Sequence, residues 1–105
     1  MKVLLDACVP RPLRKFLPDH VVHTAQEMGW GQLKNGALLQ AVEPEFDAFL
    51  TSDQNLKYQQ NIAGRKLAIL VLPTSDWPTL RRMADKIAAK VAALKPGDFV
   101  EMPAE

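Results

Sequence analysis

The sequence has one cysteine, no long apolar run and almost no net charge, and each absence excludes a class of protein. Because Cys8 is the only cysteine, neither an internal disulfide nor a cysteine-based zinc site can form, which favours a reducing compartment. No segment approaches the ~18 apolar residues of a membrane span, and Asp6 interrupts the apolar start before it reaches the length of a signal sequence. We therefore expect a cytoplasmic protein without a membrane partner.

The charge balance gives no global attraction to nucleic acid. The chain has 13 basic and 12 acidic residues, so any attraction to a polyanion must come from local patches. A length of 105 residues fits one core and is too short for two. We expect a single domain over residues 1–102, followed by a short disordered tail at 103–105.

Short apolar runs alternate with helical patterns along the chain. Buried strands are predicted at residues 2–5, 20–25, 47–52 and 66–72, with a short edge strand at 99–102. A short helix is predicted from residue 11, a second at 35–43, and a long one starting near 74–76. The apolar stripe of this last helix should face the sheet; it consists of Leu80, Met83, Ile87, Val91 and Leu94. The pattern predicts an α/β three-layer sandwich with a mainly parallel central sheet of four to five strands, in which the first strand is central.

Two acids follow predicted strands. Asp6 ends the first strand and Asp53 ends the third, so both should leave a parallel sheet at its carboxyl edge. Two carboxylates at one edge can share a cation, and oxygen ligands together with waters suit Mg²⁺ or Mn²⁺. The chemistry suggested is metal-assisted attack of water on a phosphodiester. Spacing alone leaves open that both aspartates only cap turns or helices.

Three segments carry a resemblance to a known family. "MKVLLDACVPRPLRKFL", "GWGQLKNGALLQAVEPEFDAFLTSD" and "KLAILVL", within residues 1 to 76, resemble the small PIN-like proteins related to VapC-type toxin ribonucleases. The resemblance implies a compact domain that binds Mg²⁺ or Mn²⁺ and cleaves RNA, with Asp6 and Asp53 as catalytic and metal-binding residues. It further implies the toxin component of a toxin–antitoxin system, with an antitoxin protein as partner; a homodimer is left open.

The sequence departs from the PIN-like pattern at one position. PIN-like domains usually have a further acid near the start of the helix between these strands, where this chain has Asn35. An amide can donate a neutral oxygen to a metal but adds no charge, so affinity should fall unless another acid compensates. The candidates for that compensation are Glu27, Glu43, Asp47 and Asp76. The alternative function is therefore a catalytically weakened PIN-like module that binds RNA or a protein.

A third hypothesis is a phosphoacceptor receiver domain, in which Asp53 would be phosphorylated. Such domains have adjacent acids after the first strand and a lysine at the end of the last one. Here Asp6 is a single acid and Lys95 precedes the last strand, which counts against this hypothesis.

Candidate nucleic-acid-binding residues flank both acids. They are Arg11, Arg14 and Lys15 after Asp6, and Asn55 and Lys57 after Asp53. A solvated polar loop remains the alternative for the second group. For Cys8 we expect packing into the core.

Overall fold

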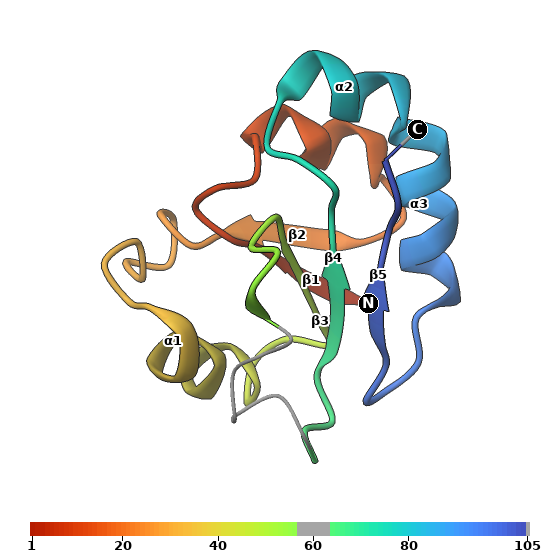
Figure 1. Cartoon of the computed structure of the whole chain (residues 1–105). Coiled ribbons are helices and arrows are strands. Elements are labelled where there is room, and N and C mark those ends of the chain that lie inside the picture. Colours follow the sequence, from red (N-terminus) through yellow and green to blue (C-terminus); the bar gives the residue numbers. More distant parts are fainter. Residues whose placement is uncertain (57–63, 105) are drawn as a thin grey trace.

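The computed structural model describes residues 1–56 and 64–104, without the side chain of Asn35. Its strands are β1 (Lys2–Leu5), β2 (Val21–Thr24), β3 (Ala48–Thr51), β4 (Ala68–Val71) and β5 (Phe99–Glu101). They form one five-stranded sheet in the order β2-β1-β3-β4-β5, in which every neighbouring pair is parallel (Figure 1). The predicted α/β class and parallel sheet are confirmed.

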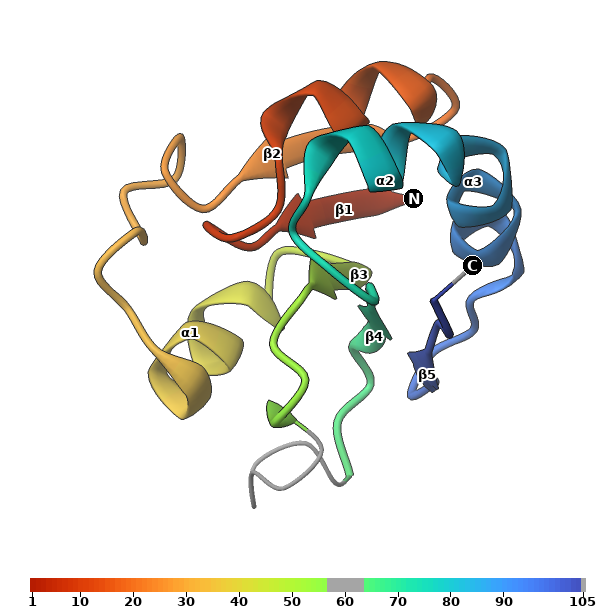
Figure 2. The ribbon, with the colours of Figure 1, turned by 45° about the horizontal axis from the view of Figure 1, so that its top comes forward.

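Helices cover both faces of the sheet. They are the 3₁₀ helix η1 (Arg11–Phe16), α1 (Asn35–Val42), α2 (Trp77–Arg82) and α3 (Ala84–Ala93). The helix α1 lies on one face, and η1, α2 and α3 lie together on the other (Figures 1 and 2). None of the helices in the described part of the chain has the length and apolar character needed to cross a membrane.

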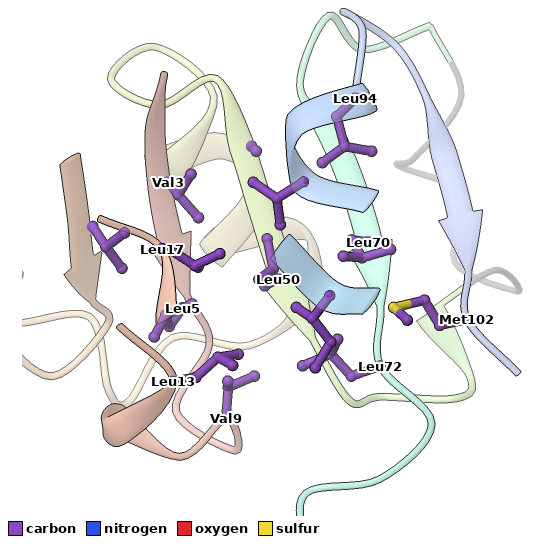
Figure 3. Close-up of a cluster of buried hydrophobic side chains, with 14 of the residues drawn as sticks. Val3, Leu5, Val9, Leu13, Leu17, Leu50, Leu70, Leu72, Leu94 and Met102 are labelled. Carbon is purple, nitrogen blue, oxygen red and sulfur yellow. The ribbon is translucent and has the colours of Figure 1, made fainter. Parts of the chain in front are cut away.

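The strands are buried on both faces, which explains their continuous apolar sequences. In β1, Val3 and Leu5 belong to the cluster under η1, α2 and α3, whereas Leu4 belongs to the cluster under α1. Figure 3 shows the first cluster, in which Leu50 and Leu70 from the neighbouring strands continue the same layer. Successive side chains of a strand point to opposite faces of the sheet, so the same short strands contribute to the apolar clusters on both faces.

Two details of the prediction are wrong. The centre of the sheet is β3, with β1 beside it, because β2 occupies the edge. The predicted long helix is divided into α2 and α3 by a turn at Met83, whose φ and ψ are −94° and 3°. The turn leaves the predicted apolar stripe intact, since all its members, from Leu80 to Leu94, are buried.

Truncation of Ile87 to Ala should therefore destabilise the protein strongly. Ile87 is completely buried, and loss of such a side chain typically costs ~2 to 5 kcal/mol. Thermal or urea unfolding measures this cost. The control Lys90→Ala changes an exposed side chain of α3 and should alter stability by less than about 0.5 kcal/mol. A melting temperature for Ile87→Ala within about a degree of wild type would show that this face is not core.

Candidate functional site

The carboxyl ends of β1 and β3 meet in the interior of the sheet. Leu5 is paired with Leu50, and the N–H of Asp6 continues the ladder by donating to the carbonyl of Leu50 at 2.9 Å. From β1 the chain proceeds to β2 on one side, whereas β4 and β5 lie on the other side of β3. In open parallel sheets of this strand order, ligands bind outside the carboxyl ends of the strands at this change of direction.

Asp6 and Asp53 line the same small cavity at this position. The cavity has a volume of about 20 Å³, and its other walls are Leu38 and Leu39 of α1, Phe49 and Thr51 of β3, and Leu56. Both aspartates are partly exposed, while these apolar walls are buried. The structure therefore brings the two predicted acids together at a mouth that solvent can reach.

Thr51 connects the two acids. Its side chain is fully buried, and its Oγ1 donates to Oδ2 of Asp6 at 2.8 Å. The same Oγ1 accepts a hydrogen bond of 3.1 Å from the backbone N–H of Asp53. One hydroxyl thus fixes a carboxylate after β1 and the backbone after β3.

Each carboxylate is also held by a local backbone N–H. Oδ1 of Asp6 accepts from Ala7 at 2.7 Å, and Oδ1 of Asp53 accepts from Asn55 at 2.9 Å. Within residues 1–56 and 64–104, no Lys or Arg side chain forms an ion pair with either acid. The two carboxylates are thus oriented by hydrogen bonds without being neutralised by a described cation.

Cys8 does not pack into the core, so that prediction is wrong. The residue is exposed, and its Sγ lies 3.6 Å from Oδ2 of Asp6 and 3.7 Å from Oγ1 of Thr51. The reason is the tight turn after β1, in which the N–H of Val9 donates to the carbonyl of Asp6 and returns the chain toward the site.

The oxygen donors suit a hard divalent cation but are few. Among the described residues, no group of three His, Cys, Asp or Glu side chains could hold a metal ion. Asp6 and Asp53 would supply two carboxylates, and Mg²⁺ commonly completes such a set with waters. The helix α1 begins at Asn35, one turn before the cavity walls Leu38 and Leu39; the Asn35 side chain lies outside the described part.

The four acids that could compensate for Asn35 have other partners. Glu27 accepts from the N–H of Thr24 and pairs with Arg14 at 3.0 Å, and these contacts lower its pKa. Asp76 caps α2, and its hydrogen bonds from the side chain and backbone of Thr79 lower its pKa.

Glu43 and Asp47 lie at the opposite edge of the sheet. Burial disfavours the charge on Glu43, but hydrogen bonds from the N–H of Lys66 and from Arg65 outweigh it and lower its pKa. Asp47 accepts from the N–H of Lys2, as expected for an acid at the amino end of β3. Both residues line a larger cavity, of about 560 Å³, which is remote from Asp6 and Asp53. None of the four acids lines the site cavity.

The candidate nucleic-acid-binding residues are divided between several environments. Arg11 and Lys15 are exposed on η1, whereas Arg14 is engaged with Glu27 and the carbonyl of Val22. Asn55 is exposed beside Asp53. Lys57 lies outside the described residues.

Thr51 was not among the site residues predicted from the sequence. The available signal was a polar side chain at the last position of a buried strand, two residues before an acid.

Comparison of the chain with known protein families, characterised proteins and solved structures gives no match.

Proposed function

We propose that the protein is a metal-dependent ribonuclease of the PIN-like toxin type, acting at the cavity between the carboxyl ends of β1 and β3. The observation that carries the proposal is that Asp6 and Asp53 line one cavity and are joined through the Thr51 hydroxyl. Structural caps would not need such a connection between two strand ends. An antitoxin protein that holds the enzyme inactive belongs to the same proposal.

The role of the chain is to present fixed negative oxygens to Mg²⁺ or Mn²⁺. Asp6 and Asp53 would hold such an ion, which would supply charge neutralisation on a phosphodiester and a lowered pKa of a water for attack on phosphorus, with the sugar oxygen as leaving group. Thr51 and the N–H of Ala7 hold the carboxylate of Asp6, and the N–H of Asn55 holds that of Asp53. The residues are thereby positioned before substrate arrives, which reduces the cost of organising the site.

In the alternative function, the protein binds RNA or a protein but does not cleave RNA. With Asn35 in place of a further acid, the metal would rely on two carboxylates and a neutral amide. A PIN-like module that binds RNA or a protein without cutting RNA would result if this set were too weak.

Incubation of the protein with end-labelled RNA tests the proposal. We expect cleavage in Mg²⁺ or Mn²⁺ and none in EDTA. Cleavage that is unaffected by the chelator would rule out the metal site, and RNA binding without cleavage at any metal concentration would favour the alternative.

Thr51→Val should damage both stability and cleavage. Valine has nearly the same shape but cannot donate to Asp6, and it leaves the partly buried N–H of Asp53 without its acceptor; such losses typically cost about 1 to 3 kcal/mol. Denaturant unfolding and the cleavage assay measure the two effects.

Thr24→Val is the matched control. Thr24 is also a buried threonine at a strand end, and its Oγ1 accepts from the N–H of Glu27, but it does not line the cavity. This variant should lose stability and retain cleavage at temperatures at which it is folded. Equal losses of cleavage in both variants would mean that Thr51 acts on stability alone.

A further inference from the structure

Basic residues gather where η1 and α2 lie side by side. The two helices are neighbours on the same face of the sheet (Figure 2). We define the η1–α2 surface by its basic residues, Arg11, Arg14 and Lys15 of η1 and Arg81 and Arg82 of α2. Because the whole chain has a net charge of only +1, this surface is a local concentration of positive charge.

Two aromatic rings join the helices on this surface. Phe16 of η1 and Trp77 of α2 have ring centroids 6.0 Å apart and planes inclined by 49°. Phe16 is 37% exposed, and Trp77 is only partly buried against the core. Flat apolar area is therefore accessible to a ligand between the charges.

The surface is hollowed on each side. Trp77, Pro78, Arg81 and Arg82 line a shallow hollow of about 460 Å³. A second hollow, of about 320 Å³, is lined by Arg11, Pro12, Arg14 and Lys15. The first hollow combines two arginines with the planar indole of Trp77, and the second combines three cationic side chains with the apolar ring of Pro12. Together they suit a ligand with both anionic groups and planar rings.

Among the described residues, three of the five basic side chains of this surface have no ion-pair partner. Arg14 pairs with Glu27, and Arg82 lies near Asp76 and donates to Oγ1 of Thr79. In residues 1–56 and 64–104, no ion pair involves Arg11, Lys15 or Arg81. These three cations can release counterions when a polyanion binds.

We propose that the η1–α2 surface binds single-stranded polynucleotide, with phosphates on Arg11, Lys15 and Arg81 and bases against Phe16 and Trp77. Single strands fit because their unstacked bases can reach aromatic rings, whereas a duplex keeps its bases stacked inside. The inference deepens the proposed function by naming the single-stranded form of the polynucleotide and the surface that binds it. It rests on that proposed function.

The surface adjoins the proposed site. The helix η1 starts five residues after Asp6, and α2 follows the carboxyl end of β4, two strands from β1. Both helices therefore begin at the edge of the sheet that holds Asp6 and Asp53 (Figures 1 and 2). A polynucleotide bound along η1 and α2 would pass close to that edge of the sheet.

Fluorescence anisotropy with a labelled 15-nucleotide strand tests the proposal without catalysis. The full chain carrying Asp53→Asn is titrated in EDTA against single-stranded RNA, single-stranded DNA and duplex RNA, so failure of cleavage cannot affect the result. The combined variant Arg11→Gln, Lys15→Gln, Arg81→Gln should lower the slope of log affinity against log salt by about 2, since each phosphate contact on a single strand contributes about 0.7. The control variant Lys86→Gln, Lys90→Gln, Lys95→Gln removes the same charge from exposed positions elsewhere and should leave the slope unchanged.

Ring substitutions test the stacking. Trp77→Leu should weaken binding about 5- to 150-fold, the usual loss for one base–aromatic stack, while Trp77→Phe should retain most of the affinity. Thermal melting verifies that each variant is folded. Preference for RNA over DNA would assign the surface to RNA, and equal affinity would assign it to single strands of either kind.

Several results would overturn the proposal. They are tighter binding of duplex than of single strands, equal effects of the two triple variants, or no binding of any oligonucleotide. Equally tight binding of polyglutamate, with the same sensitivity to the variants, would instead mark the surface as a docking site for an acidic protein. Binding as proposed by a wild-type protein that cleaves nothing in Mg²⁺ would refute the proposed function and leave this inference standing.

Discussion

Asp53→Asn should abolish metal-dependent RNA cleavage while the free energy of unfolding is maintained or rises. The substitution removes a charge and little else, because the amide oxygen of asparagine can still accept from the N–H of Asn55 as Oδ1 of Asp53 does. Both carboxylates line one cavity, so removal of one relieves their repulsion. We expect cleavage to fall at least about a hundredfold, the usual loss when a group that stabilises developing charge is removed.

Asp47→Asn is the matched control for this prediction. Asp47 is an acid at the opposite edge of the sheet, where its Oδ2 accepts from the N–H of Lys2. Its substitution should leave cleavage unchanged. If Asp53 were only a structural cap, Asp53→Asn would retain cleavage; Asp53→Ala loses the hydrogen bond from Asn55 on either reading and should cost about 0.5 to 2 kcal/mol of stability. Urea unfolding and the cleavage assay on the same preparations separate the two cases.

Most strand positions were predictable because the buried strands appear in the sequence as short apolar runs. Residues 3–5 and 67–72 are continuous apolar runs, as expected of short strands that helices cover on both faces. The turn at Met83 was not predictable, because Met83 continues the apolar stripe and favours helix in sequence.

The pairing of the two acids was predictable in outline only. The rule for parallel strands places Asp6 and Asp53 at one edge, but the adjacency of β1 and β3 depends on β2 taking the outer position. The hydrogen bond from Thr51 to Asp6 joins residues 45 positions apart and exists only in this register. The exposure of Cys8 follows from a turn geometry that its apolar character does not reveal.

The strand order also bears on the receiver hypothesis. The order β2-β1-β3-β4-β5 occurs in flavodoxin-like folds generally, so the sheet alone does not distinguish a phosphoacceptor from a nuclease. Lys95, however, lines the cavity at the amino edge of the sheet together with Met1 and Asp47. It therefore lies at the far edge from Asp53 and cannot take the role that a receiver requires of its lysine.

Asn35→Asp should raise the affinity for Mn²⁺ at least about fivefold, because a unit charge about 4 Å from another is worth about 1 kcal/mol even in bulk water. The start of α1 lies one turn before Leu38 and Leu39, which line the cavity with Asp6 and Asp53. Isothermal titration calorimetry measures the gain, and combination with Asp53→Asn should reverse most of it.

Gln40→Glu is the matched control, since it adds the same charge to an exposed position of the same helix. Equal gains in both variants would mean that the metal responds to net charge, and no gain in Asn35→Asp would show that the start of α1 does not reach the ion. Cleavage distinguishes the two proposed functions. If Asn35→Asp binds metal more tightly and also cleaves RNA faster, the wild-type protein is an enzyme limited by its metal. If metal affinity rises and cleavage remains absent, the missing acid is not what prevents catalysis, and the RNA-binding module becomes the better account of the protein.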